Sequence, residues 1–190
     1  MNKIFRFLAI CTFSVAFASI VWAQTYMTVD YPGAVGTTLN GGPNPQGTSV
    51  GSYSSDSFIS TSHGFTLTSK GVFTSFDPPG SLFTTPNSIS PQEIIVGSYF
   101  DSSFAQHGFV LANGQYTTVD YPSAARTSLN GMNPSGEIVG FYCATAPDCI
   151  NGITHSFILS KKDQFTSFDP PGAISSSASN VNPSGAIAGA

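Results

Sequence analysis

The stretch TTVDYPSAARTSLNGMNPSGEIVGFY, residues 117–142, decides the fold because the chain repeats it. Residues 27–53, 74–99 and 166–189 carry the same succession of an alternating apolar segment, an Asp-x-Pro step, an asparagine, a proline turn and a glycine-containing segment. Self-similarity at a fixed period of 20 to 50 residues is typical of repeat arrays such as solenoids and propellers. The aspartates that open the copies are Asp30, Asp77, Asp120 and Asp169, and the asparagines that follow are Asn40, Asn87, Asn130 and Asn180.

Each repeat predicts about four short β-strands. Segments such as FTSFD alternate in the β manner and end at a proline, which cannot donate to a strand ladder. The segment EIVGFY holds a glycine, which indicates a bulge or a close approach of backbone. Four strands in a unit of this length match a propeller blade. We therefore expect an all-β, β-propeller-like array of four-stranded repeats, with three complete units and a truncated fourth at about 26–71, 72–114, 115–162 and 163–190.

The fourth copy stops at Ala190, before the HGF-type strand that follows in the other three. An unpaired apolar strand edge invites pairing with another chain. Three alternatives stay open at this point. The sequence is a fragment of a longer protein, or TYMTVD (25–30) closes the last unit into a small four-bladed ring, or two chains complete each other by self-association.

The succession NPSGEIVGFY and HSF, with HGF in two other copies, resembles the HAF-type extracellular repeats of bacterial exported proteins, which carry His-Ala-Phe at this place. The resemblance covers nearly all of residues 26–190. It implies a β-propeller-like fold and an extracellular setting, and it implies no particular activity.

Residues 1–23 have the pattern of a secretory signal peptide. Lys3 and Arg6 precede the apolar run FLAICTFSVAFASIV, and VWA, ending at Ala23, supplies small residues for cleavage. The run is too short for a membrane span. We expect a mature domain at 24–190 that is secreted, periplasmic or held at the cell envelope.

The mature chain is acidic and sparsely charged. Its basic residues are Lys70, Arg126, Lys161 and Lys162, against ten carboxylates in all. This balance argues against nucleic acid and anionic membranes as partners, and leaves a glycan or a protein as the ligand to expect.

Two cysteines remain after cleavage, Cys143 and Cys149 in CATAPDC. In an exported chain so close a pair predicts a local disulfide. A metal site is disfavoured because no further cysteine or histidine lies at ligand spacing.

The stretch GTSVG (47–51) fits the G-x-S-x-G nucleophile elbow. In the repeat, however, Ser49 falls on the strand position held by Ile138 and Ile187, and no helix follows it. Ser49 is therefore interpreted as a strand residue and not as a nucleophile.

Recurring carboxylates and histidines are interpreted first as structural. The four repeat aspartates are expected to accept backbone N–H bonds in turns, and a ring of aspartates that binds Ca²⁺ is the alternative. Glu93 and Glu137 are assigned to one shared repeat position. The repeat histidines are expected to bond to neighbouring backbone, with a three-histidine zinc site as the alternative; they are His63, His107 and His155.

Candidate ligand-binding residues are the aromatics that follow the VG strand, Tyr53, Tyr99 and Tyr142. They can stack on sugar rings or anchor a protein, and packing between units is the alternative.

No nucleotide, zinc-protease or cofactor fingerprint is present. We therefore expect an exported, non-catalytic module without a cofactor that binds a ligand or serves as a scaffold. The rival hypothesis is an envelope polysaccharide hydrolase or lyase with catalytic carboxylates on loops, for which Asp148 and Asp163 are the candidates outside the repeat.

Overall fold

The computed structural model describes residues 27–56 and 61–190. The described chain is nearly all β, which confirms the all-β part of the prediction, and contains one short helix, α1 (Ala146–Ile150). The predicted signal peptide, 1–23, lies outside the described residues. Within the described part of the chain, no helix is both long and apolar enough to cross a membrane.

The strands form four successive antiparallel groups, in each of which neighbours along the chain are neighbours in the ladder. The first group is β1 (Gly36–Gly41), β2 (Ser49–Ser54), β3 (His63–Leu67) and β4 (Phe73–Phe76). The second is β5 (Phe83–Ile89), β6 (Ile95–Phe100), β7 (Gln106–Ala112) and β8 (Gln115–Val119). The third is β9 (Arg126–Met132), β10 (Ile138–Cys143), β11 (His155–Leu159) and β12 (Phe165–Phe168). The fourth is β13 (Ala178–Val181) and β14 (Ile187–Gly189).

The hydrogen-bonded groups are offset from the units expected from the sequence. Strand β4 lies after residue 71, at the start of the second expected unit, yet it pairs with β3 of the first group. Strands β8 and β12 pair in the same way with β7 and β11. The second, third and fourth sequence copies therefore each give their opening strand to the group before them.

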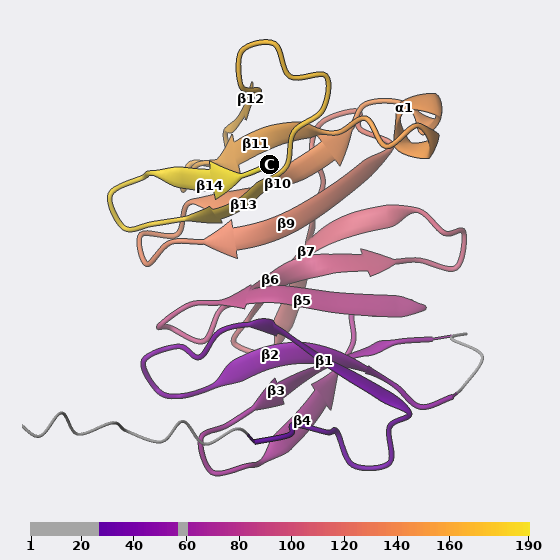
Figure 1. The fold of residues 1–190 in the computed structure, drawn as a ribbon, viewed down its shortest axis with the longest axis vertical. Coiled ribbons are helices and arrows are strands. Elements are labelled where there is room, and N and C mark those ends of the chain that lie inside the picture. The colour runs from indigo at the N-terminus through magenta and orange to yellow at the C-terminus, as the bar shows by residue number, and fades with distance from the viewer. Residues whose placement is uncertain (1–26, 57–60) are drawn as a thin grey trace, which may run out of the picture.

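Along the long axis of the molecule, β1–β4 lie at one end, β5–β7 lie in the middle, and the third and fourth groups lie together toward the other end, with β12 outermost (Figure 1). A short backbone contact recurs at each junction, from the residue before the repeat histidine to the segment that begins the next group. Gln106 pairs with Arg126 in parallel, which joins the second and third groups into one eight-stranded sheet. The corresponding contacts are the Ser62 bridge to Phe83 and the bond from the Ser176 N–H to the Thr154 carbonyl.

Three apolar cores lie between the groups. Phe109 and Ile95 of the second group pack with Val50 of the first. Phe157 and Ile138 of the third group pack with Val96 of the second. The third core joins Val139, Ile158 and Phe168 of the third group to Ala178, Val181 and Ile187 of the fourth. Burial of these side chains stabilises each junction by several kcal/mol, at about 25 cal/mol per Å² of apolar surface.

The first strand of each group contains a one-residue register shift opposite a glycine, as the glycine in the VG segment predicted. In the third group, Leu129 pairs with Gly140 and Gly131 pairs with Val139, so that Asn130 is the extra residue of a bulge. A Cβ on Gly140 would collide with the carbonyl oxygen of Ser128. Shifts at the same place leave Asn40 and Asn87 as the extra residues of β1 and β5.

The fourth group corrects the sequence alignment. Ala178 pairs with Gly189 and Asn180 pairs with Ala188, so the extra residue of β13 is Ser179. Asn180 thus lies one position beyond the place of Asn130. The two copies have the same length between the aspartate and the proline turn, so Ser179 stands at the place of Asn130 and Asn180 at the place of Gly131.

The proline turns are closed by side-chain caps. The Oδ1 atom of Asn133 accepts the N–H of Glu137, and the Gly136 N–H bonds to the Asn133 carbonyl. Gly136 has φ +89°, a conformation that suits glycine. In the second group this place is held by Glu93, with φ 60°, whose N–H bonds to the Ser90 carbonyl. Glu93 therefore corresponds to Gly136 and not to Glu137, and the shared position assigned to the two glutamates is wrong.

Replacing Glu93 with glycine is expected to stabilise the protein by about 0.5–1 kcal/mol, because the left-handed backbone conformation disfavours a residue with a Cβ. Equilibrium urea unfolding measures the change. The reciprocal control is Gly136→Glu, which has open space around its Cβ position, with only Lys161 Cγ 3.9 Å away. It should destabilise the protein by at least as much, and a stabilising Gly136→Glu would contradict the argument.

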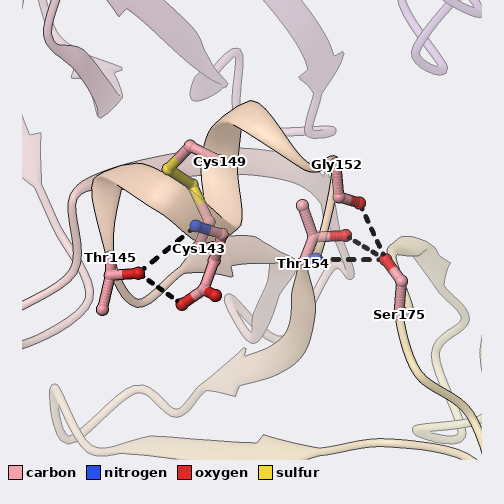
Figure 2. Close-up of a disulfide and its surroundings, with 7 residues drawn as sticks. Cys143, Thr145, Cys149, Gly152, Thr154 and Ser175 are labelled. Atoms are coloured by element: carbon pink, nitrogen blue, oxygen red, sulfur yellow. Dashed lines mark hydrogen bonds between the residues drawn. A yellow bond between two sulfur atoms is a disulfide. The ribbon is translucent and has the colours of Figure 1, made fainter.

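The insert CATAPDC forms α1, which the sequence interpretation did not predict (Figure 2). Thr145 caps the helix by accepting the Asp148 N–H and donating its hydroxyl to the Asp148 carboxylate. Cys149 is disulfide-bonded to Cys143 of β10, with the Cα atoms 5.4 Å apart, which confirms the predicted pair. Beyond the helix, the Ser175 hydroxyl donates to the Gly152 carbonyl and accepts the Thr154 N–H. The insert therefore fixes the segment that leads into the fourth group.

Removing the disulfide in a Cys143→Ser/Cys149→Ser variant is expected to lower the free energy of unfolding by about 2 kcal/mol, the chain-entropy value for so small a loop. Urea unfolding measures the loss. The same loss should follow when the unchanged protein is unfolded in excess reductant. An unaltered unfolding midpoint would show that the helical insert holds its shape without the bond.

Candidate functional site

The first strands of the four groups border a single polar cavity. Strand β5 contacts both β1 and β9, and β9 contacts β13. The cavity measures about 290 Å³, and asparagine side chains from all four strands line it. Its lining residues are Asn40, Gly41, Gly42, Asn87, Ser88, Asn130, Ser179 and Asn180. We call this the axial cavity.

Two of the four asparagines tie one group to the next. The Nδ2 atom of Asn87 donates to the Leu129 carbonyl of the third group at 2.9 Å. The Nδ2 atom of Asn130 donates to the Ala178 carbonyl of the fourth group at 2.8 Å. The bulge makes this possible, because the unpaired residue turns its side chain away from its own ladder and toward the neighbouring first strand.

The other two asparagines are less engaged and more exposed. Asn40 donates to the Ser52 hydroxyl at 3.4 Å, within its own group. Asn180 accepts the N–H of the adjacent Val181 at 2.7 Å. Asn40 and Asn180 belong to β1 and β13, the first and last of the four adjoining first strands. Because both side chains line the axial cavity, a molecule there would contact amide groups of the first and the fourth groups together.

The chemistry of the axial cavity is that of neutral hydrogen bonding. Each amide offers a carbonyl oxygen as acceptor and an NH₂ group as donor, and Ser88 and Ser179 add hydroxyls. None of its described lining residues carries a charge. Such a surface suits hydroxyl and amide groups better than carboxylates or phosphates.

The repeat histidines and aspartates meet in pairs at the ends of the third and fourth strands. The imidazole Nδ1 to carboxylate Oδ2 distances are 2.7 Å for His63–Asp77, 2.8 Å for His107–Asp120 and 2.9 Å for His155–Asp169. Because a carboxylate only accepts, Nδ1 carries the proton. The expected bond from the ring to backbone is therefore wrong. The aspartates do accept a backbone N–H as well, from Gly64, Gly108 and Ser156.

The residue after each repeat aspartate determines which hydrogen bond joins its loop to the first strand of the following group. Pro78 has no N–H, and the Thr84 hydroxyl donates to Asp77 at 2.6 Å. Tyr121 has an N–H, which donates to the Thr127 hydroxyl at 2.9 Å. Either way a hydroxyl seven residues beyond the aspartate joins the loop to the strand that leads into the axial cavity.

His107 lies near a second carboxylate, because its Nε2 is 3.5 Å from Asp101 Oδ2. Burial alone would lower the pKa of His107, but the hydrogen bonds and charges of Asp120 and then of Asp101 outweigh it and raise the pKa above 6.5. The pKa of Asp101 is lowered to about 2, chiefly by the Ser103 hydroxyl and the Ala105 N–H. The pKa of Asp169 is lowered chiefly by the Ser176 hydroxyl, against a smaller opposing effect of burial.

These shifts predict that stability depends on pH in two ranges. A raised histidine pKa adds stability that is complete below 6.5 and is lost as the pH rises through the folded-state pKa. The lowered pKa of Asp101 adds stability that is present above 3.8 and is lost as the pH falls toward 2, and the lowered pKa of Asp169 acts in the same direction.

We expect Asp101→Asn to lower the His107 pKa and to reduce the fall in stability above pH 6.5. An NMR titration of the imidazole and urea unfolding at mildly acidic and mildly alkaline pH measure the two effects. His107→Gln is the matched variant, which should remove this fall in stability. A His107 pKa unmoved by Asp101→Asn would contradict the contribution of the second carboxylate.

The candidate tyrosines are half-buried, and each hydroxyl lies 3.0 Å from a hydroxyl of the fourth strand of its group, at Ser75, Thr118 and Ser167 respectively. Tyr53 stacks on Tyr31 and Tyr142 stacks on Tyr121, with ring centroids 3.7 Å apart in both pairs. At the place of Tyr31 the second copy has Pro78, so Tyr99 is not stacked in this way. Tyr99 and Tyr142 also pack against the apolar cores between groups, and a binding role for the tyrosines stays a prediction.

The candidate catalytic residues occupy structural places. Ser49 lies in β2 opposite Leu67, in the register in which Ile138 of β10 lies opposite Leu159, so its strand assignment is confirmed. Asp148 belongs to the cap of α1, and Asp163, with φ 55°, forms the turn between β11 and β12. Within residues 27–56 and 61–190, no group of three or more His, Cys, Asp or Glu side chains is arranged to hold a metal ion.

Comparison with known proteins does not assign the chain to a family. No protein-family model matches the chain, and no curated protein matches its sequence.

The axial cavity was not predicted, although its asparagines were recognised as repeat residues. The signal that could have found it is their shared place shortly before the proline turn, on the segment that forms the first strand of each group.

Proposed function

We propose that the chain is an exported, non-catalytic binding module whose strand groups are the blades of a propeller-like array. Its ligand occupies the axial cavity. Four-stranded meanders whose first strands lie side by side are the arrangement that blades have around a propeller axis. The alternation of such groups with three apolar cores supports the same arrangement.

The observation that carries the proposal is the gathering of asparagines from four sequence copies around one cavity. Ligand pockets join a concave surface to a few convergent polar groups. Paired amide donors and acceptors match the hydroxyl and acetamido groups of sugars. The proposed ligand is therefore a short, uncharged glycan or a sugar residue of a longer one, bound without a cofactor.

The disposition of the carboxylates supports binding in place of catalysis. A glycosidase needs two carboxyl groups that face each other across the substrate. Here Asp77, Asp120 and Asp169 are held by histidines, and the axial cavity has no carboxylate among its described lining residues.

The proposed export rests on two observations of different kinds. The first is the signal-peptide pattern of residues 1–23. The second is the Cys143–Cys149 disulfide, which is consistent with an oxidising compartment outside the cytosol.

The asparagines allow the binding and structural roles to be separated. Asn40→Ala and Asn180→Ala should change stability by less than about 0.5 kcal/mol, because neither side chain ties one group to the next. Asn87→Ala and Asn130→Ala should cost about 1–2 kcal/mol each, since each leaves a carbonyl of the next group without its partner.

The binding test uses saturation-transfer difference NMR with a panel of neutral monosaccharides and disaccharides. A sugar that binds the unchanged protein should lose its signal with the Asn40→Ala/Asn180→Ala double variant. Tyr99→Ala is the control for binding on the outer aromatic surface. Absence of binding across the panel, or loss of binding with Tyr99→Ala alone, would refute the axial site.

A further inference from the structure

Two pairs of stacked tyrosines have a geometry that packing alone does not favour. The rings of Tyr31 and Tyr53 have centroids 3.7 Å apart and are 5° from parallel. Those of Tyr121 and Tyr142 have centroids 3.7 Å apart and are 2° from parallel. Aromatic pairs prefer offset or edge-on arrangements with centroids about 4.5–7 Å apart, because the electron-rich faces of two rings repel each other. The first and third groups therefore both keep a face-to-face arrangement that ring electrostatics disfavours.

The hydroxyl groups of each pair lie at the same end. Tyr53 Oη is 3.0 Å from Ser75 Oγ, and the pKa of Tyr31 is raised chiefly by a hydrogen bond to Tyr53. Burial, and then the Tyr142 hydroxyl, likewise raise the pKa of Tyr121. Since the ring planes are also nearly parallel, the Cε atoms, next to the hydroxyl on one ring, face those of the other ring.

The surroundings keep the two rings of each pair in contact. Phe73 meets the Tyr31 ring edge-on, with centroids 5.3 Å apart, and the imidazole of His63 lies 5.2 Å from the Tyr53 ring. The Tyr31 N–H donates to the Thr37 hydroxyl, which fixes the loop before β1. The third group repeats all three contacts with its own equivalent residues.

We propose that each stacked pair is a site of oxidative cross-linking, at which the two tyrosines are joined as dityrosine. The co-reactant is a one-electron oxidising system, a haem peroxidase with hydrogen peroxide. Each phenol loses one electron and one proton, and the two phenoxyl radicals form a bond between their Cε atoms. The proton on each joined carbon then moves to the oxygen of its ring, which restores both aromatic systems. Two hydrogen atoms leave in total, and one hydrogen peroxide becomes two water molecules.

The stacked geometry is close to that of the coupling step. A ring carbon becomes tetrahedral as the new bond forms, so the bond develops across the faces of the two rings. Centroids 3.7 Å apart place the facing carbons near the separation of about 3–3.5 Å that reacting atoms have in a near-attack arrangement. Tyr99 is the internal contrast, because Pro78 stands at the place of the partner ring. Its hydroxyl nevertheless has the same kind of contact, 3.0 Å from Thr118 Oγ1.

The new bond would fasten the segments that lead into two first strands. Tyr31 precedes β1 and Tyr121 lies between β8 and β9, while their partners lie in β2 and β10. Each cross-link therefore closes a loop around β1 or β9, two of the strands that line the axial cavity. Closing a loop lowers the entropy of the unfolded chain and so stabilises the folded one. This role does not depend on the proposed ligand of the cavity.

The test treats the dilute purified protein with a haem peroxidase and hydrogen peroxide. Peptide mass spectrometry should find Tyr31 joined to Tyr53 and Tyr121 joined to Tyr142, each with the loss of two hydrogen atoms. A mixture of isotope-labelled and unlabelled protein should give links only within one chain. Dityrosine fluorescence per chain should not change with protein concentration.

Substitutions of single rings separate the two sites. Tyr31→Phe should abolish the first link and keep the second, and Tyr121→Phe should do the reverse, because phenylalanine cannot form a phenoxyl radical. Pro78→Tyr is the matched gain, which should create a third link, to Tyr99. The oxidised unchanged protein should unfold at a higher urea concentration than before oxidation. The Tyr31→Phe/Tyr121→Phe double variant should show no such rise.

Three results would overturn the proposal. The first is a stacked pair that stays unlinked under conditions that couple free tyrosine, which removes the assignment of that pair. The second is links that form only between chains. The third is linkage of Tyr99 in the unchanged protein as readily as of the stacked tyrosines, which would show that stacking does not direct the reaction. If Pro78→Tyr fails to fold, the two phenylalanine variants still decide the question.

Discussion

A single steric constraint, one extra residue in the first strand opposite a glycine in the second, shapes each strand group. The glycine lets the carbonyl of the bulged strand lie where a Cβ would otherwise be, as Ser128 does at Gly140. The same glycine receives the phenylalanine ring of the third strand from its other side, so that Phe157 is fully buried. Any larger residue would displace both neighbours, because proteins are packed too densely to absorb an added methyl group in such a place.

The bulge also links packing to the polar cavity. An unpaired residue in the ladder bends the first strand and directs its side chain out of the group. In β5 and β9 that residue is asparagine, and its amide reaches the backbone of the next group. The contact that orients successive groups and the surface proposed to bind a ligand are therefore made by the same side chains. Binding at the outer asparagines, Asn40 and Asn180, leaves these ties in place.

The repeat made much of the fold predictable, because four copies of one pattern must adopt one local structure. It placed Ser49 in a strand against the G-x-S-x-G motif, and it placed the glycines at close backbone approaches. Matching the copies by their asparagines hid that Asn180 is shifted, since Ser179 takes the bulge position in β13 and the asparagine follows it by one residue. The repeat also did not show that histidine bonds to aspartate, because the two are 13 or 14 positions apart and meet only when the third and fourth strands pair.

The last junction separates the contributions of the individual strands to packing and to the polar cavity. Val139, Ile158 and Phe168 present the same apolar face to the fourth group that Val96 and Val119 present to the third. In the fourth group, β13 and β14 pack against this face. These two strands suffice to bury Ala178 and Val181 and to bring Asn180 to the axial cavity. In the other groups the fully buried phenylalanine comes from the third strand. The axial cavity and the buried phenylalanine therefore depend on different strands, because the asparagines lie in the first strand of each group and the ring comes from the third.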